Sequence, residues 1–98
     1  MTARLTPAEI SLALRDLAGW AHDEDQHRIC RTFVFSNFSE AFAFMTRVAM
    51  IAETQDHHPE WTNTYNRVEI ALTTHDANGL TNRDIGFARS VNALGRDA

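Results

Sequence analysis

The sequence predicts an α+β domain in which three helices accompany a four-stranded antiparallel sheet. Three segments open with helix-capping signals and carry apolar stripes at helical spacing, while four short segments alternate apolar with polar residues. They follow one another as helix, two strands, helix, two strands, helix. Residues 1–98 are expected to form one domain near the lower end of the usual size range. Its core is thin, so association into an oligomer would help to stabilise it.

Composition narrows the class of protein. The net charge is −4, all nine basic residues are arginine, and no basic stripe is present that could follow a nucleic acid backbone. Charged residues interrupt the N-terminal segment 1–17, which is therefore predicted to be neither a signal peptide nor a membrane span. The single cysteine, Cys30, cannot form an intrachain disulfide, which favours a reducing cytoplasm.

The first helix has a clear start. Thr6 is its predicted N-cap, Pro7 stands at the first helical position, and Glu9 completes a capping box. Gly19 is predicted to end the helix. Its apolar stripe consists of Ile10, Leu14 and Leu17.

Two strands are predicted in the segment 20–36. The polar run 23–26 is typical of a turn between them. Beyond the turn, apolar residues alternate with more polar ones until Val34 interrupts the pattern. The alternating apolar residues are Ile29, Phe33 and Phe35.

The central helix is predicted to run from the capping residue Asn37, with Glu40 three positions on, to about Asp56. Its apolar residues are too many for one small sheet to cover. Either the helix is deeply buried or, as we favour, its second apolar face meets another subunit through Phe44 and Ile51. The first face consists of Phe38, Phe42, Met45, Ala49 and Ala52, and the second of Phe44, Val48 and Ile51.

The segment 59–75 is predicted to form a hairpin with a two-residue turn at 66–67. Continued outward from that turn, the pairing would place His58 opposite His75. Directly opposed residues on antiparallel strands have Cβ atoms about 4.5–5.5 Å apart. Three imidazoles, those of His57, His58 and His75, would therefore converge at the open end of the hairpin.

The last helix is predicted to begin at Thr81, after the loop 76–80, with Asp84 as its capping-box partner. An apolar stripe follows at helical spacing. It consists of Ile85, Ala88, Val91 and Leu94.

The tandem pair His57-His58, in the stretch "ETQDHHPEW", is the most unusual feature of the sequence. Free histidine has a pKa of about 6.5, so grouped imidazoles can exchange protons near neutral pH. Carboxylates nearby in the sequence could fix their tautomers or hold polar groups of a substrate. These carboxylates belong to Glu53, Asp56, Asp76 and Asp84.

Other interpretations of these residues stay open. Three histidines can hold zinc, but the side chains of adjacent histidines diverge, so acid–base chemistry is favoured over metal binding. A His-His pair can also be a solvated turn, as we expect for His22 and His27. Asp84 can serve only as the capping partner of Thr81, and Trp20 can be a core residue.

Seven residues stand at a characteristic spacing: Glu53, His57, His58, Pro59, Tyr65, His75 and Asp84. Shorter stretches such as "GW" at 19–20, "FMTRVA" at 44–49 and "GLTNRDI" at 79–85 extend the pattern over nearly the whole chain. Together they resemble the pterin-4a-carbinolamine dehydratase family. The resemblance implies a four-stranded antiparallel sheet with three helices packed on one face. It also implies dimers or tetramers, assembled through sheet edges and the central helix.

The reaction implied by this resemblance is that of a 4a-hydroxytetrahydrobiopterin dehydratase, a hydro-lyase. Loss of water from 4a-hydroxytetrahydropterin gives quinonoid dihydropterin, so that the pterin used by an aromatic amino acid hydroxylase is recycled. No redox change occurs, so neither a metal nor an organic cofactor is implied. Animal members of the family also act as dimerisation cofactors of a transcription factor. The alternative is therefore a non-catalytic interaction protein, although a pure binding scaffold would not need three histidines.

The resemblance and the predicted geometry together suggest a role for each site residue. The catalytic residues are expected to be His57, His58 and His75. His57 and His75 are expected to be the acid–base pair, while His58 holds the pterin and tunes its neighbours or exchanges roles with His57. Trp20 is expected to form an aromatic wall over the ring. Hydrogen bonds to the amide edge of the pterin are expected from Asp56, Thr73, Thr74 and Asp76, and support for the histidines from the carboxylates of Glu53 and Asp84.

Overall fold

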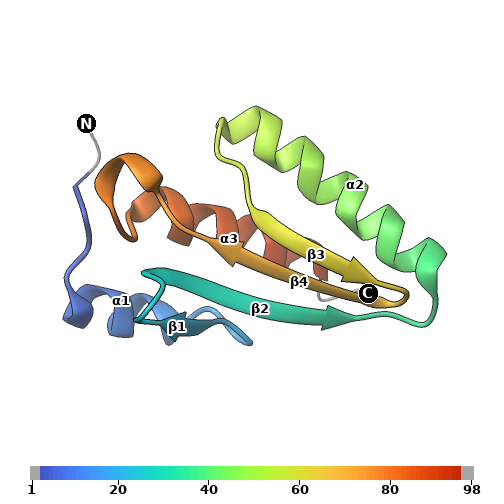
Figure 1. The fold of residues 1–98 in the computed structure, drawn as a ribbon, viewed down its shortest axis with the longest axis horizontal. Coiled ribbons are helices and arrows are strands. Elements are labelled where there is room, and N and C mark those ends of the chain that lie inside the picture. The colour runs from blue at the N-terminus through green and yellow to red at the C-terminus, as the bar shows by residue number, and fades with distance from the viewer. Residues whose placement is uncertain (1–2, 96–98) are drawn as a thin grey trace.

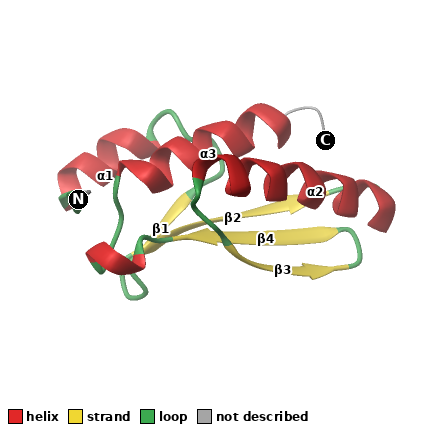
Figure 2. Ribbon diagram, turned by 90° about the horizontal axis from the view of Figure 1, so that it is seen from above, coloured by secondary structure: helices red, strands yellow, loops and turns green. Residues whose placement is uncertain are grey.

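The computed structural model describes residues 3–95 and has the predicted order of elements. The elements are α1 (Pro7–Leu14), β1 (Ala21–Asp23), β2 (Arg28–Val34), α2 (Phe38–Gln55), β3 (Glu60–Thr64), β4 (Arg67–Leu72), the short 3-10 helix η1 (His75–Ala77) and α3 (Asn82–Gly95). The strands form one antiparallel sheet in the order β1-β2-β4-β3. Figure 2 shows α2 and α3 lying over one face of this sheet, and α1 lies near β1 (Figure 1). The predicted α+β class is therefore confirmed.

The start of α1 is the predicted capping box. Thr6 Oγ1 accepts the Glu9 N–H at 3.2 Å, and Glu9 Oε1 accepts the Thr6 N–H at 2.8 Å. The regular helix ends at Leu14, earlier than expected, and turns continue to Gly19, whose φ is +87°. A Cβ at Gly19 would lie 2.4 Å from Nε of Arg31. Glycine is therefore favoured there by its conformation, and a larger residue would also displace the Arg31 side chain.

α2 begins and ends close to its predicted bounds. The Asn37 side chain accepts the Glu40 N–H at 2.9 Å, but Glu40 Oε1 accepts the N–H of Ser36 (3.1 Å) rather than that of Asn37. At the other end, Asp56 takes the left-handed conformation, with φ of 50°. The N–H groups of Asp56 and His57 both bond to the Ala52 carbonyl. This ending satisfies the carbonyl and turns the chain away from the helix axis.

The prediction that Phe44 contacts another subunit is wrong, whereas that for Ile51 stays a prediction. Phe44 is 4% exposed and packs in the core of its own chain, with its ring centroid 4.7 Å from that of Phe33 and 4.9 Å from that of Phe35. Ile51 is partly buried against the same core. Periodicity identified two apolar stripes on α2, but it could not tell which of them faces the sheet.

The other apolar face of α2 is left in solvent only in part, since Ala52 is buried in the core and Met45 packs against it. Phe38 is 48% exposed, Phe42 58% and Met50 66%, and Ala49 is exposed beside them. The rings of Phe38 and Phe42 contact each other, with centroids 5.9 Å apart. We call Phe38, Phe42, Ala49 and Met50 the α2 outer strip.

The hairpin of β3 and β4 turns one residue earlier than predicted. Thr64 pairs with Arg67, and Trp61 pairs with Ile70 rather than with Leu72, as a turn at 66–67 would require. Tyr65 occupies the left-handed region, with φ of 50°. Asn66 joins the turn to the end of β2, since its side chain donates to the Phe35 carbonyl and its own carbonyl accepts the Phe35 N–H, both at 2.8 Å.

This register overturns the predicted pairing of His58 with His75. β3 begins only at Glu60 and β4 ends at Leu72, so neither histidine lies in a strand. His75 instead opens η1. The pairing is displaced by two residues, so each side chain of the hairpin keeps its predicted face of the sheet.

The core lies between the sheet and the helices. Trp20 belongs to it, with a side chain that is 6% exposed and an Nε1–H that donates to Asn92 Oδ1 at 2.7 Å. Leu17, Ile29, Leu72, Phe87 and Val91 are among its fully buried members. No helix within residues 3–95 is long and apolar enough to cross a membrane.

Candidate active site

The three histidines of the signature meet at one end of the molecule, where α2 and β4 end and α3 begins (Figure 1). They line one cavity of about 240 Å³, which we call the histidine cavity. Its lining residues are Asp56, His57, His58, Thr73, Thr74, His75, Asp76 and Arg83. The structure thus groups the three histidines around one cavity with the four residues expected to bind the amide edge of the pterin, which are Asp56, Thr73, Thr74 and Asp76. The predicted hairpin register is not what groups them.

His57 is the buried member of the group. Its side chain is 8% exposed, and its Nε2 lies 2.6 Å from Oδ1 of Asp84, which is 0% exposed. The ring also meets the edge of Phe87, with centroids 6.1 Å apart. The left-handed Asp56 turns the chain so that His57, the next residue, points back toward α3. Since Asp84 accepts at Nε2, the Nδ1 atom of His57 is the nitrogen left for a ligand.

Asp84 is held by an ordered chain of hydrogen bonds. Its Oδ2 accepts the Thr81 N–H at 3.0 Å and the Thr74 hydroxyl at 2.8 Å. Thr74 has given its only hydroxyl proton to Asp84, so the 2.8 Å contact between the two threonine hydroxyls must have Thr81 as donor. The Thr81 oxygen in turn accepts the Arg83 N–H at 3.2 Å. Asp84 is therefore both the predicted capping partner of α3 and the support of His57.

His58 and His75 are much more open to solvent. Nε2 of His58 lies 2.7 Å from Glu53, with side chains 58% and 80% exposed. Nε2 of His75 lies 3.7 Å from Glu60, with side chains 79% and 53% exposed. Exposed pairs of this kind contribute about 0–1 kcal/mol. Their rings are therefore held less firmly than that of His57.

Arg83 is a site residue that sequence reasoning missed. It lines the histidine cavity, and its Nη2 donates a short hydrogen bond to the Asp56 carbonyl at the end of α2. This bond joins the first turn of α3 to the segment that carries His57. The only sequence signal was its position next to Asp84 in "TNRD".

Trp20 is not brought to the cavity. It is buried in the core and is not among the residues that line the histidine cavity, so the expectation that it covers the pterin ring is corrected. Thr73 does line the cavity, and its hydroxyl donates to the His27 carbonyl at 2.7 Å. Within residues 3–95, no three His, Cys, Asp or Glu side chains are grouped so that they could hold a metal ion.

Comparisons with known proteins identify the family of the chain. A family model described as pterin 4 alpha carbinolamine dehydratase matches residues 3–94. A protein of Rhodopseudomonas palustris strain BisB18, named as a candidate pterin-4-alpha-carbinolamine dehydratase, is 57% identical over 94 residues, which cover 96% of this chain and 93% of its own. A similarly named protein of Novosphingobium aromaticivorans is 56% identical and covers 94% and 96%, respectively.

A solved structure is also similar. The crystal structure described as a transcriptional coactivator/pterin dehydratase from Brucella melitensis superposes with a TM-score of 0.91 and 50% sequence identity. The match covers 94% of this chain and 98% of that chain. Sequence, fold and family model thus agree over nearly the whole length, and the chain belongs to the pterin-4a-carbinolamine dehydratase family.

Proposed function

We propose that this chain catalyses the dehydration of 4a-hydroxytetrahydropterin to quinonoid dihydropterin and water, with histidines as the acid and the base. The observation that carries the proposal is the His57–Asp84 pair, which opens onto a cavity lined by two further histidines. Acid–base groups positioned in this way contribute factors of roughly 10²–10⁴ in rate.

The reaction requires two proton transfers. The C4a–O bond breaks as an acid protonates the hydroxyl group, because hydroxide is a poor leaving group and water is a good one. A base removes the proton from N5, and the electron pair of the N5–H bond completes the C4a=N5 double bond. No electrons enter or leave the substrate, so the proposal includes no metal or organic cofactor.

His57 and His75 are the proposed proton-transfer pair. Asp84 holds the Nε2–H of His57, so Nδ1 can accept a proton from the substrate or, after protonation, donate one. The carboxylate also stabilises the positive charge that forms on the ring. His75 lines the same cavity from η1, in a solvent-exposed position where it can exchange its proton with water.

The remaining residues are proposed to hold the pterin. His58, supported by Glu53, lies next to His57 and would contact the ring. Polar groups that suit the amide edge of a pterin come from Asp56, Thr73, Thr74, Asp76 and Arg83. Thr74 has its hydroxyl proton engaged with Asp84 and its backbone N–H with the Gly79 carbonyl, so it could contact the pterin only as an acceptor.

The direct test is turnover. The purified protein is mixed with 4a-hydroxytetrahydropterin, and formation of quinonoid dihydropterin is followed by ultraviolet absorbance against the spontaneous reaction. Rapid turnover after treatment with a chelator is the expected result. A rate equal to the spontaneous one would refute the proposal, and a rate lost on chelation would refute metal-independent chemistry.

This activity would recycle the pterin of an aromatic amino acid hydroxylase. A cytoplasmic location is proposed with it, because the lone Cys30 suits a reducing compartment.

An interaction protein is the second candidate function. The Brucella melitensis protein is described as a transcriptional coactivator as well as a pterin dehydratase. In this chain, the α2 outer strip leaves two contacting phenylalanine rings exposed. We propose that this strip mediates a homo-oligomer, a dimer or a tetramer, because a second copy would cover its apolar surface. Absence of turnover combined with a stable complex with another protein would favour the non-catalytic alternative.

A further inference from the structure

His75 lies in a small closed loop between β4 and α3. Thr74 and Gly79 form an isolated antiparallel bridge, in which the N–H of each residue bonds to the carbonyl of the other, at 3.1 and 3.4 Å. Inside this bridge, η1 carries His75, and Asn78 donates its N–H to the His75 carbonyl at 3.0 Å. We call residues 74–80 the His75 loop. These bonds make the loop a compact unit, so a shift of the loop also shifts His75.

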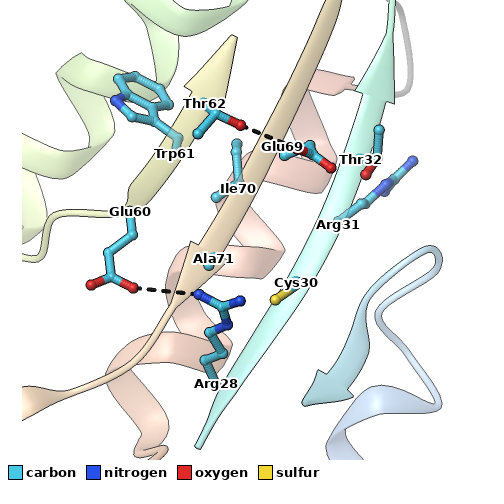
Figure 3. A pocket seen from close by; sticks show the side chains of 10 residues that line it. All are labelled: Arg28, Cys30, Arg31, Thr32, Glu60, Trp61, Thr62, Glu69, Ile70 and Ala71. Atoms are coloured by element: carbon cyan, nitrogen blue, oxygen red, sulfur yellow. Dashed lines mark hydrogen bonds and ion pairs between the residues drawn. The ribbon is translucent and has the colours of Figure 1, made fainter. Parts of the chain in front are cut away.

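The ring of His75 has few contacts of its own. Within residues 3–95 its one ion pair is with Glu60, at 3.7 Å, which is too long for a hydrogen bond, and 79% of the His75 side chain is exposed. Figure 3 shows the Glu60 carboxylate directed toward Arg28, so His75 shares this partner. The direction of the imidazole therefore depends on the backbone of the His75 loop.

The N-terminal segment runs beside the end of this loop (Figure 1). The Leu5 N–H donates to the Leu80 carbonyl at 2.7 Å, and Arg4 Nη1 donates to the Asn78 carbonyl at 3.3 Å. We call Arg4 and Leu5 the N-terminal strap. The strap holds the end of the His75 loop, whereas the start of the loop is bonded to the carboxylate that supports His57.

The N-terminal strap is itself fixed in place. The Leu5 side chain packs against the core, and the next residue, Thr6, caps α1. Gly79 leaves room for the Arg4 side chain, since a Cβ at Gly79 would lie 2.7 Å from Cδ and 3.2 Å from Cγ of Arg4. Arg4 thus crosses the His75 loop at Gly79 and bonds to it at Asn78.

We propose that the N-terminal strap positions His75 for proton transfer, with Arg4 as a positioning residue that acts through Asn78. The inference rests on the proposed dehydratase function and extends it to a residue 74 positions before Asn78 in the chain. Arg4 bonds to the carbonyl of Asn78, and the N–H of Asn78 bonds to the carbonyl of His75. When the end of the loop is released, η1 can shift relative to His57. A misplacement of about 1 Å can cost a factor of about 10² in rate.

The first test is the kinetics of Arg4→Ala. An ordinary hydrogen bond is worth a factor of about 2 to 12 in an equilibrium, and the Leu5 bond remains in this variant. Arg4→Ala should therefore lower kcat at saturating substrate about 2- to 12-fold. KM should change less, because His58 and Asp56 lie outside the His75 loop. Arg15→Ala is the matched control, since Arg15 is an exposed arginine at the end of α1 whose side chain makes no hydrogen bond or ion pair within residues 3–95.

A second background separates positioning from general stability. In His75→Ala protein there is no ring left to position, so adding Arg4→Ala should leave the remaining kcat unchanged. The measurement uses excess enzyme, so that the remaining rate can be compared with the spontaneous one. A general loss of stability would lower the rate in both backgrounds.

Gly79 allows the contact to be broken from the other side. The three atoms nearest to a Cβ at Gly79 all belong to Arg4, so Gly79→Ala displaces the Arg4 side chain. Gly79→Ala alone should lower kcat about as much as Arg4→Ala does. In the double variant the added Cβ has space, so kcat should fall no further than in Arg4→Ala.

Amide hydrogen exchange follows the loop without turnover. In Arg4→Ala the Asn78 amide, which bonds to His75, should exchange about 2- to 12-fold faster than in the wild type. The amide of Val48, a buried residue of α2, should exchange at the wild-type rate.

The outcomes separate the strap from the proposed function. Wild-type kcat in Arg4→Ala overturns the inference while the dehydratase function stands. An equal loss of kcat in the His75→Ala background, or additive losses in the Arg4→Ala/Gly79→Ala double variant, also overturns it. Wild-type turnover at the spontaneous rate overturns the proposed function and the inference with it. A loss of kcat that disappears without His75, together with faster exchange at Asn78, supports the inference.

Discussion

Replacing Asp84 by asparagine should switch the tautomer of His57. The position occupied by Oδ2 faces the Thr81 N–H at 3.0 Å, and a backbone N–H can only donate. The oxygen of the new amide is therefore drawn to Thr81, and its NH₂ group is turned toward Nε2 of His57. That nitrogen must then accept, so the ring proton moves to Nδ1. Nδ1 then carries the proton, so it has no free lone pair with which to act as a base.

The expected loss of rate follows from this switch. A general acid–base group contributes roughly 10²–10⁴-fold, so Asp84→Asn should lower kcat by about that factor with a smaller effect on KM. The variant should also lose stability. Hydrogen bonds to charged groups contribute about 1.5–3 kcal/mol, and the amide replaces them only in part. In a domain of this size, each 1 kcal/mol lost lowers Tm by about 4–8 °C, so rates must be measured well below the melting range.

The assay combines enzyme kinetics with a measurement of the tautomer of the His57 ring. Stopped-flow absorbance gives kcat and KM for 4a-hydroxytetrahydropterin, and ¹⁵N chemical shifts of the His57 imidazole report which nitrogen carries the proton. Glu53→Gln serves as the comparison, because Glu53 makes the same kind of contact to His58 at 2.7 Å but is 80% exposed. Exposed pairs contribute about 0.2–1 kcal/mol, so that variant should lose at most about fivefold. A folded Asp84→Asn protein that retains its kcat, or an unchanged His57 tautomer, would refute the reasoning.

Three further predictions concern other parts of the chain. His57→Ala and His75→Ala should each lower kcat roughly 10- to 10⁴-fold, whereas His22→Ala, outside the histidine cavity, should retain wild-type kinetics; a fully active His75→Ala protein would contradict its proposed role. Phe42→Asp should reduce the mass found by light scattering, because it places a charge on the α2 outer strip, and an unchanged oligomer would refute assembly through that strip. Burial raises the pKa of the Cys30 thiol, so less thiolate is present at a given pH. Iodoacetamide should therefore react with Cys30 more slowly than with free cysteine at pH 8, and the reaction should become faster as the pH rises. A faster reaction with Cys30 than with free cysteine would contradict this.

Local signals in the sequence were sufficient for most of the fold. Capping boxes depend on residues three positions apart, so Thr6 and Glu9 marked the start of α1 correctly, and Thr81 and Asp84 marked that of α3. Three of the strands followed from alternation, which a shift of two residues in register leaves intact, and the first followed from the polar turn after it. The seven-residue signature identified the family in the same way, since it needs only spacing along the chain.

Features that depend on distant contacts could not be predicted. The hairpin turn lies at Tyr65-Asn66 because Asn66 bonds to Phe35, which is far away in sequence. The face of α2 that carries Phe44 was predicted to meet another subunit, but Phe44 packs in the core of its own chain. Periodicity does not say what lies opposite an apolar stripe. Trp20 was expected to cover the pterin, but its Nε1–H is engaged with Asn92 of α3 and its ring lies in the core. In each case the deciding partner comes from another element.

The histidine cavity depends on where elements end rather than on how strands pair. α2 ends in the left-handed Asp56, which directs His57 toward α3. β4 ends before η1, which carries His75, and the cap of α3 supplies Asp84. These ends lie at the same side of the sheet, so their residues meet without any pairing between His58 and His75. The three histidines therefore line one cavity despite the incorrect register. If this cavity is the active site, a variant that moves one of these ends should disturb catalysis more than a change within β3 or β4.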